Sequence, residues 1–482
     1  MEGFEEELEE PVSPTAQYLN SSSLCVYILS VIAFEVPIDD IPALSLLQEK
    51  FIPMNTRFSS IMIEDKNGEK KWKKVEVKLE EHVKTPIFPS SKSSLYDEHF
   101  DEYMSKLAME RLPEDRPLWE VHLIKYPTKN AAGSAILKLH HALGDGYSLM
   151  GALLSCFVRV DNPSLPFTLP STQTPKSIFN TKDVFKNYIF SIFSNVFNTI
   201  SDFGWSVLKS SLVKDDFTPI KSNANDTKFL QITVSSISIT MDHIKEIKSR
   251  LGVSINDVLV GIIFLGIRLY MQEMNKDSSK YKSTALVLMN TRSIKGYKSI
   301  KEMVDKNNKN GPWGNQFAFL HTPIPELNDT NIENPLDFIL EAHEEINRKK
   351  NSLGAPLTGL LLNVMKKLRG PEASARYIYN TIGNSSLTIS NLVGPMEQMT
   401  VANYRVKSIY HIVTGVPNSI AVSIVSYMGM LRITFALEKD FFDKEKFMSC
   451  MEKSLQLIEY SSKRDISIKS KHFSMPTMTT RI

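Results

Sequence analysis

Residues 134–146 read SAILKLHHALGDG, and this stretch decides the fold class of the chain. Residues 134–141 form a short apolar run that predicts a strand, and residues 148–160 (SLMGALLSCFVRV) predict the helix after it. Gly144 and Gly146 permit a sharp turn between the two elements. A strand that passes directly into a helix, repeated along a chain, is typical of α/β folds.

The alternation of strands and helices continues on both sides of this stretch. Upstream, residues 24–34 (LCVYILSVIAF) are rich in strand formers and too short to span a bilayer, which needs about 20 apolar residues. Downstream, residues 254–274 predict a helix with Ser254 at the N-cap and Asp257 three residues on, as in a capping box. Further strands are predicted at residues 229–239, 284–290, 385–392, 419–427 and 431–437.

These elements divide the chain into two α/β halves joined by a linker. Residues 16–162 form the first half and residues 228–462 the second. Between them, residues 163–227 combine a proline-rich linker with an apolar helix. Residues 1–15 are expected to be a disordered acidic tail, and residues 463–482 a basic tail.

The composition is that of a globular protein and excludes several classes of function. Of 482 residues, 42% are hydrophobic and 23% are charged, and the net charge of +2 includes no basic run dense enough for nucleic acid binding. Cys25, Cys156 and Cys450 are far apart and outside any CxxC spacing, so neither a disulfide framework nor a zinc site is expected. The acidic start, MEGFEEELEE, does not resemble a secretory signal and indicates a chain that faces the cytosol.

The strongest candidate for chemistry is His141. Because side chains alternate along a strand, His141 shares a face with Leu137 and Leu139, while His140 points to the opposite face in a supporting role. Burial on an apolar face lowers the pKa of His141, and a neutral imidazole is what a general base needs. Asp145, between two glycines, is expected to anchor the turn and not to take a proton.

Other interpretations start from the same residues. A buried histidine is in general most often a satisfied core residue. A metal site is disfavoured, because His140 and His141 are adjacent on a strand and the sequence has no visible cluster for a third ligand. A serine hydrolase needs a nucleophile elbow, and the sequence contains no G-x-S-x-G. The spacing alone therefore favours a general base and leaves the core-histidine alternative open.

HHALGDG resembles the HHxxxDG signature of CoA-dependent acyltransferases with the chloramphenicol-acetyltransferase-like fold. Five further motifs make the chain similar to the wax ester synthase/diacylglycerol acyltransferase family, particularly its plant branch. They are PLWE (117–120), ND (256–257), LMNTR (288–292), GNQF (314–317) and SNLVGP (390–395). HHxxxDG alone also occurs in peptide-synthetase condensation domains and plant phenolic acyltransferases, so the combination is much the more specific signal.

The resemblance implies two similar subdomains with mixed sheets flanked by helices, and an active-site tunnel at their interface with His141 at its centre. It implies transfer of a long-chain acyl group from acyl-CoA to a fatty alcohol, often with weaker activity toward diacylglycerol. No metal or other cofactor is implied, because acyl-CoA is a co-substrate. An arginine that holds Asp145 is also implied, with Arg292 in that position. Candidates for substrate binding are Asn256, Asp257, Arg292 and Asn315.

These secondary candidates have structural alternatives. Arg292 also suits a solvated position at a strand end, and Asn256 and Asp257 suit helix capping. Trp119 in the PLWE motif is expected to be structural, packed beneath the catalytic strand. A group of lysines suits either attraction of CoA phosphates or a solvated basic loop. They are Lys295, Lys298, Lys301, Lys306 and Lys309.

Residues 184–208 are the best candidate for membrane contact. Their apolar side chains recur at helical spacing and form one stripe, opposite a polar side that includes Asn198 and Asp202. A helix lying on a bilayer surface is therefore favoured, while a single span or packing onto the protein stays open. With water-insoluble substrates, this predicts the cytosolic face of the endoplasmic reticulum or plasma membrane. The stripe comprises Phe185, Ile189, Ile192, Phe193, Val196, Phe197, Ile200 and Phe203.

Two other functions stay open. A soluble enzyme that acylates phenolic or other polar alcohols would share HHxxxDG, but PLWE, NDVLVG and the absence of a DFGWG-type sequence near the C-terminus count against it. A catalytically silent lipid-binding protein would keep the fold, and the intact HHxxxDG counts against that function.

Overall fold

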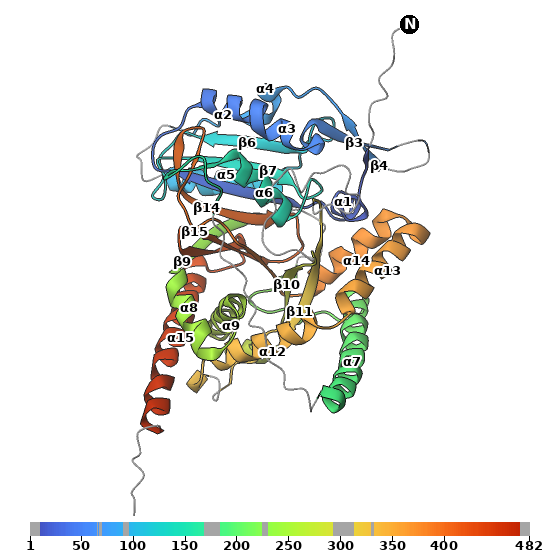
Figure 1. The fold of residues 1–482 in the computed structure, drawn as a ribbon, viewed down its shortest axis with the longest axis vertical. Coiled ribbons are helices and arrows are strands. Elements are labelled where there is room, and N and C mark those ends of the chain that lie inside the picture. The colour runs from blue at the N-terminus through green and yellow to red at the C-terminus, as the bar shows by residue number, and fades with distance from the viewer. Residues whose placement is uncertain are drawn as a thin grey trace, which may run out of the picture.

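The computed structural model describes residues 10–64, 66, 70–89, 96–167, 184–223, 230–292, 313–328 and 332–472, and the backbone alone for residues 184–197, 279 and 464–472. Its described part is built on two large β-sheets, one above the other, with helices packed around them (Figure 1). A small sheet of β1 (Glu10–Pro11), β4 (Lys70–Lys74) and β3 (Ser60–Glu64) lies beside the first large one (Figure 1). The predicted fold class, an α/β protein of two subdomains with mixed sheets, is confirmed.

The strands of the first large sheet are, in order, β5 (Val83–Lys84), β6 (Trp119–Ile124), β7 (Gly133–His140), β2 (Tyr27–Phe34), β14 (Tyr404–Thr414), β13 (Met399–Val401) and β8 (Val158–Arg159). At its centre, β7 pairs antiparallel with β2 and β6. The strands predicted at residues 24–34 and 134–141 are therefore present. The helix predicted at residues 148–160 is α6 (Gly146–Cys156), and it ends early because the chain leaves it to form the edge strand β8.

Strands β13 and β14 correct the predicted division of the chain. The sequence assigns all of residues 228–462 to the second half, but β14 pairs with β2 and brings β13 into the first sheet. In this register His411 of β14 lies opposite Ser30 of β2. The exchange covers an edge of β2 whose backbone groups would otherwise be unpaired. No local pattern encodes a pairing between segments so far apart in sequence.

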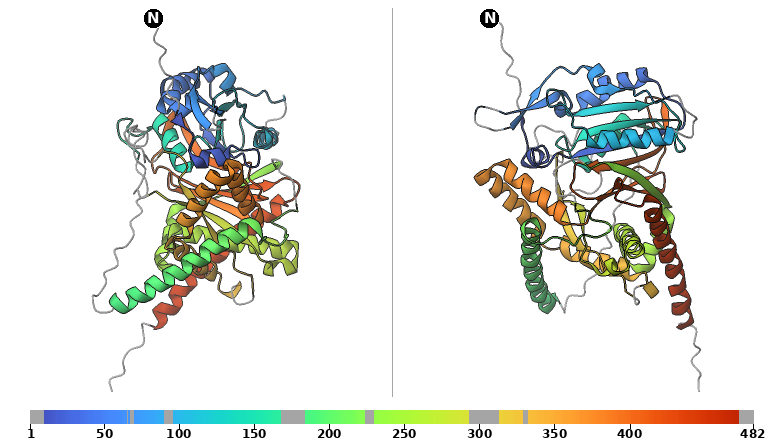
Figure 2. Two further views of the ribbon diagram at one scale, coloured as in Figure 1. Left: turned by 90° about the vertical axis from the view of Figure 1, so that its right-hand side faces the viewer. Right: turned by 180° about the vertical axis from the view of Figure 1, so that it is seen from behind.

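The strands of the second large sheet are, in order, β11 (Phe317–Pro323), β10 (Thr284–Asn290), β12 (Leu387–Leu392), β15 (Ile420–Tyr427), β16 (Met430–Glu438) and β9 (Ile232–Thr240). All except β11 occupy predicted stretches. Helix α9 (Ile255–Met274) begins with the predicted capping box and packs between α12 (Asp337–Lys350) and α15 (Lys444–His472) (Figure 2). In the described part of the chain, α9 alone has the length and composition of a membrane span, but most of it is buried as core.

The N-terminal segment is ordered earlier than predicted. A disordered tail through residue 15 is wrong for its last residues, since Glu10–Pro11 form β1 on the edge of β4 (Lys70–Lys74). Val12 is buried in the core of the first half, and α1 (Pro14–Leu19) follows. Burial of an apolar side chain together with strand pairing holds this segment in place. The first nine residues lie outside the described part.

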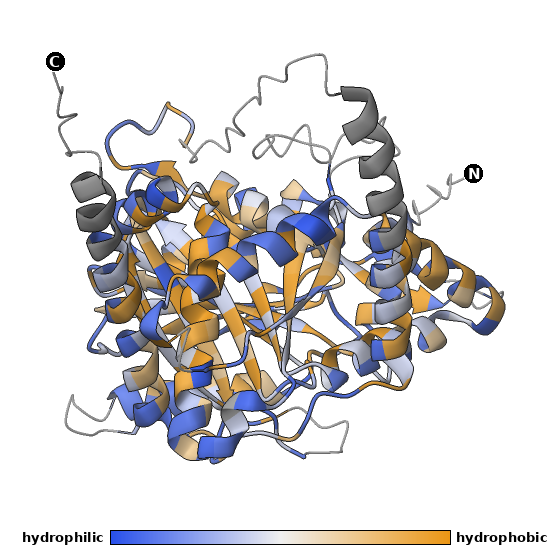
Figure 3. Cartoon of the chain, turned by 90° about the horizontal axis from the view of Figure 1, so that it is seen from below, coloured by the Kyte–Doolittle hydropathy of each residue, from blue (hydrophilic) through white to orange (hydrophobic). Residues whose placement is uncertain are grey.

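Helices α7 (Val184–Ser211), α13 (Gly354–Arg369) and α14 (Pro371–Asn384) lie together beside the second sheet (Figures 1 and 2). The predicted helix at residues 184–208 is α7, although the side chains of most of its predicted stripe lie outside the described part. Where side chains are described, Asp202 turns inward to Arg348 and Lys349, whereas Ile200 is 67% exposed. The polar side of α7 thus faces the protein. Figure 3 shows α13 at the edge of the molecule with many hydrophobic residues.

Candidate active site

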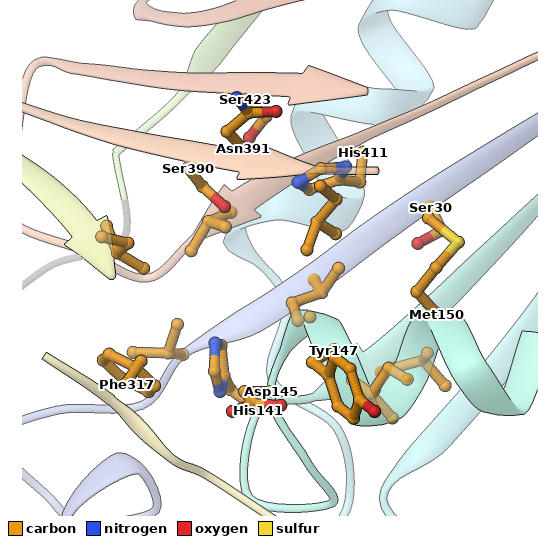
Figure 4. Close-up of a pocket in the computed structure, with 18 of the residues that line it drawn as sticks. Ser30, His141, Asp145, Tyr147, Met150, Phe317, Ser390, Asn391, His411 and Ser423 are labelled. Carbon is orange, nitrogen blue, oxygen red and sulfur yellow. The ribbon is translucent and has the colours of Figure 1, made fainter. Parts of the chain in front are cut away.

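A cavity of about 700 Å³ lies where the two large sheets face each other, at the predicted interface between subdomains. Its wall is mostly apolar. Leu137, Leu139 and His141 all line it, so the alternation predicted for the catalytic strand is confirmed. In Figure 4, His141 and Asp145 lie on one side of the cavity and His411 with several serines on the other.

The side chain of His141 is oriented by Asn315, which comes from the other half of the chain. Asn315 Nδ2 donates to the carbonyl oxygen of His141 at 2.9 Å, and Asn315 Oδ1 lies 2.9 Å from His141 Nδ1. Because a carbonyl oxygen can only accept, the amide has one orientation, with Oδ1 toward the ring. Nδ1 therefore carries the hydrogen, and Nε2 keeps its lone pair for a substrate proton.

Burial sets the protonation state of His141. The side chain is 7% exposed, and desolvation lowers its pKa below the ordinary value of 6.5. The nearby charge of Asp145 and the hydrogen bond to Asn315 act in the opposite direction but are smaller. The imidazole is thus neutral near pH 7, as a general base requires.

His140 faces away from the cavity, as predicted. Its Nδ1 accepts the backbone N–H of Ala142 at 3.0 Å, which fixes the turn that follows the strand. The other nitrogen, Nε2, lies 3.4 Å from the sulfur of Cys25, and the ring packs edge-on against Tyr27. Complete burial lowers the pKa of His140 to about 3, so this ring is a neutral structural group.

The predicted ion pair between Arg292 and Asp145 is present and bidentate, with N–O distances of 2.7 and 3.0 Å. Asp145 also accepts the backbone N–H groups of Ser148, where it caps α6, and of Gln316. Both carboxylate oxygens are therefore engaged, and Arg292 lies nearly fully buried beside Tyr147. This geometry suits an anchor of the turn and leaves Asp145 no free oxygen to take a proton.

The segment carrying Asn315 wraps around the turn after β7. Trp313 Nε1 donates to the carbonyl of Leu143 at 3.0 Å, and the backbone N–H of Gly314 donates to the hydroxyl of Ser148. Gly314 has φ +114°, a conformation that side chains rarely adopt, so glycine is needed here. Through these contacts the second half of the chain completes the site of the first.

The other predicted substrate-binding residues have structural partners. Asp257 is buried in its capping box and pairs with His343 at 2.7 Å, contacts that agree with the helix-capping alternative. Asn256 accepts a hydrogen bond of 3.3 Å from Asn391, which does line the cavity. Trp119 is fully buried and donates to the carbonyl of Phe58, in agreement with its predicted structural role. The lysines between residues 295 and 310 lie outside the described part.

The cavity also contains a histidine that the sequence did not single out. His411 is 4% exposed, lines the cavity, and has no hydrogen-bond partner at either ring nitrogen within the described chain. Burial, and secondarily the charge of His141, lower its pKa to about 4. The only local signal was a polar residue between Ile409 and Val413 on an otherwise apolar strand face.

Two stretches of the chain match one family. Residues 42–259 match the "Wax ester synthase/diacylglycerol acyltransferase catalytic domain", and residues 313–459 match the "WS/DGAT C-terminal domain". Together they include His141, Asp145 and Asn315. The chain belongs to this family.

Curated relatives from Arabidopsis thaliana resemble the chain over nearly its whole length. Wax ester synthase/diacylglycerol acyltransferase 4 is 29% identical, with 95% of this chain and 91% of the relative covered. For wax ester synthase/diacylglycerol acyltransferase 5 the identity is 28%, and 94% of each chain is covered. This family member is accordingly an acyl-CoA-dependent O-acyltransferase, and the predicted enzyme class is confirmed.

Solved structures support the fold. The wax ester synthase/diacylglycerol acyltransferase from Marinobacter aquaeolei VT8 is 16% identical, with a TM-score of 0.57 over 94% of this chain and 99% of that one. A starter condensation domain of rhizomide synthetase, in complex with C8-CoA, is 10% identical with a TM-score of 0.54, and 94% of each chain is covered. The two-subdomain architecture is thus shared across both groups.

Proposed function

We propose that this protein transfers a long-chain acyl group from acyl-CoA to a long-chain fatty alcohol, and also to diacylglycerol, with His141 as general base. The observation that carries the proposal is the pair of hydrogen bonds between His141 and Asn315, which leaves Nε2 of His141 as the basic nitrogen at the cavity wall. Family membership supports the substrate classes, since the relatives are named wax ester synthase/diacylglycerol acyltransferases.

The reaction needs one proton to move twice. Nε2 of His141 takes the hydroxyl proton of the acceptor as its oxygen attacks the thioester carbonyl. The tetrahedral intermediate then collapses, the C–S bond breaks, and the imidazolium returns the proton to the thiolate of CoA. Asn315 stabilises the transient imidazolium by accepting its Nδ1–H, and Asp145 adds favourable charge nearby. Acyl-CoA supplies the acyl group, so we propose that no metal or other cofactor takes part.

The cavity wall supports long alkyl chains as substrates. Side chains from both sheets line the cavity with hydrocarbon, among them Leu139 of β7, Leu288 of β10 and Val422 of β15. Burial of apolar surface gives about 25 cal/mol per Å², so each methylene of a bound chain adds to its affinity. A strongly polar acceptor would gain little from such a wall, and a small phenolic ring would gain less than a long alkyl chain.

The decisive experiment supplies purified protein with labelled palmitoyl-CoA and competing acceptors. We expect wax ester from 1-hexadecanol, triacylglycerol from 1,2-dioleoylglycerol, and little product from a phenolic alcohol, with the rates unchanged by EDTA. Transfer mainly to the phenolic alcohol would contradict the proposed substrate class. A folded protein without transfer to any acceptor would support a silent lipid-binding protein instead.

We further propose that the protein works at a membrane surface, where its acceptors are concentrated. Exposed apolar side chains on α7 and α13 form one region beside the second sheet, and the last turn of α13 adds Lys366, Lys367 and Arg369. An apolar helix face next to basic residues suits an anionic bilayer surface. The apolar set is Ile200, Trp205 and Leu208 of α7 with Leu212 just after it, and Leu360, Val364 and Leu368 of α13 with Leu353 just before it.

Liposome flotation tests this surface. Leu360→Asp together with Leu368→Asp should release much of the protein from anionic liposomes, while turnover of dispersed short-chain alcohols should persist because the cavity is untouched. Ile41→Asp is the matched control, since Ile41 is 76% exposed on α2 (Asp40–Leu46), which Figure 1 shows at the top of the molecule, away from α7 and α13. Equal release by both variants, or by neither, would contradict the assignment.

The membrane we propose is that of the endoplasmic reticulum or plasma membrane, on its cytosolic face. The three cysteines, Cys25, Cys156 and Cys450, are all free and buried, which fits a reducing compartment. Protease protection of microsomes and plasma membrane vesicles, followed with an antibody to the chain, distinguishes the two faces. Protection without detergent would contradict a cytosolic orientation.

A further inference from the structure

The cavity contains a second polar site, separate from the catalytic turn formed by residues 140–146. It is built from two cross-strand pairs on two different sheets. His411 of β14 lies opposite Ser30 of β2, and Ser390 of β12 lies opposite Ser423 of β15. All four line the cavity, and Figure 4 shows them on the side away from Asp145. Hydrogen-bonding groups from four strands thus face one cavity whose wall is otherwise largely hydrocarbon.

His411 is the strongest member of this group because its polar atoms are unused. Both ring nitrogens are buried without a hydrogen-bond partner in the described chain. Buried polar groups are nearly always paired in native proteins, and leaving one unpaired is costly. A neutral imidazole has one donor and one acceptor to offer, so a substrate with oxygen atoms would satisfy it.

The position of His411 relative to His141 limits what can bind there. Ser30 of β2 lies between His411 of β14 and Leu137 of β7. His411 is therefore level with Leu137, which comes four residues before His141. These backbone positions are well apart, but both side chains line the shared cavity, and His141 is near enough for its charge to lower the pKa of His411. An acceptor whose hydroxyl meets His141 would therefore reach His411 with a part set back from the reacting oxygen.

We propose that His411, with Ser30, Ser390 and Ser423, binds the ester oxygens of a glycerol diester acceptor, and so makes diacylglycerol a substrate beside simple alcohols. This inference rests on the proposed function of the site. A glycerol diester carries its ester oxygens beside the hydroxyl, and the four side chains on this wall offer them hydrogen-bonding partners. A fatty alcohol has only methylenes at that place. The pantetheine arm of CoA spaces its amides along a line and suits the group less well.

The test compares acceptors in four proteins with palmitoyl-CoA as donor. Wild type, His411→Leu, His411→Asn and Ile409→Leu are assayed with 1-hexadecanol, 1,2-dioleoylglycerol and the dialkyl ether analogue of the diester, which lacks carbonyl groups. The ratio of kcat/KM for dioleoylglycerol to that for hexadecanol should fall about tenfold in His411→Leu, the usual value of one lost hydrogen bond. His411→Asn keeps a donor and should recover part of the ratio.

The controls separate this inference from the proposed function. Ile409→Leu changes the same face of β14 without a polar group and should leave the ratio near that of wild type. The ether analogue should be a poor acceptor for wild type and lose little further in His411→Leu. An unchanged ratio in His411→Leu overturns the inference, as does a raised KM for palmitoyl-CoA with every acceptor. Wild type that makes wax ester but no triacylglycerol overturns it too, while no product from any acceptor refutes the proposed function itself.

Discussion

The catalytic turn and the opposite wall of the cavity differ in how their polar groups are satisfied. In the turn, Nδ1 of His141 has Asn315, Asp145 has Arg292, and Nδ1 of His140 has the N–H of Ala142. On the wall, both nitrogens of His411 lack partners in the described chain. Chemistry needs groups fixed before substrate arrives, because reorganisation during the reaction would raise the barrier. Recognition needs groups left open for the substrate to complete.

The largest expected effect comes from removing the base. His141→Ala should lower turnover of hexadecanol by roughly 10²–10⁴-fold, the usual contribution of a positioned general base. His140→Ala should cost less activity, because that ring faces away from the cavity and supports only the turn. Steady-state rates of wax ester formation, with folding checked by circular dichroism, measure both. Equal and near-complete losses in two folded variants would contradict the assigned roles.

The second effect concerns the anchor of the turn. Asp145→Asn or Arg292→Ala leaves a buried partner uncompensated, and each should lower the free energy of unfolding by about 3–5 kcal/mol along with activity. The double variant should be milder than the sum of the two, because neighbouring groups couple. Urea denaturation of the four proteins gives the coupling energy. Strictly additive losses would show that the two residues act independently.

A smaller change is expected when Asn315 is shortened. In Asn315→Ala the hydrogen of the His141 ring is no longer held on Nδ1, so Nε2 is available as the base for only part of the time. We expect kcat to fall at least about tenfold. The hydrogen bond that His141 donates to Asn315 Oδ1 raises the pKa of His141, so its loss lowers that pKa further. The acid limb of the pH–rate profile, where activity falls as His141 becomes protonated, should therefore move to lower pH. Asn334→Ala, an exposed asparagine on another loop, should move neither kcat nor the limb.

The catalytic turn was largely predictable from sequence, and the opposite wall was not. Period-two alternation along β7 is a local signal, and it correctly gave the side to which His140 and His141 point. The pairing of Arg292 with Asp145 was anticipated only through family resemblance. The partner of His141 was missed, since Asn315 was expected to bind substrate and its contact spans two halves of the chain. His411 could not be found because its place depends on β14 crossing into the first sheet.

The smallest expected effect is on stability, and it has opposite signs at the two histidines that the mechanism does not use. His140→Leu removes an acceptor from the N–H of Ala142 and should destabilise the protein by about 1–3 kcal/mol at pH 7.5. His411→Leu removes a buried polar group that has no partner, so it should be neutral or stabilise by at most about 1 kcal/mol. Urea denaturation without substrate measures both changes.

Lowering the pH should widen the advantage of His411→Leu. Burial lowers the pKa of His411 from 6.5 to about 4. Between pH 6.5 and pH 4, His411 is therefore protonated in the unfolded chain but neutral in the folded protein. This group therefore costs wild type stability as pH falls from about 6.5 toward 4, at about 1.4 kcal/mol per pH unit, and the leucine variant escapes that loss. At pH 5.5 the variant should accordingly be more stable than wild type by about 1 kcal/mol beyond the difference at pH 7.5. A stability difference that stays constant with pH would mean that His411 is not held neutral by burial. It would contradict the contrast between the hydrogen-bonded groups of the turn and the unpaired ring of His411.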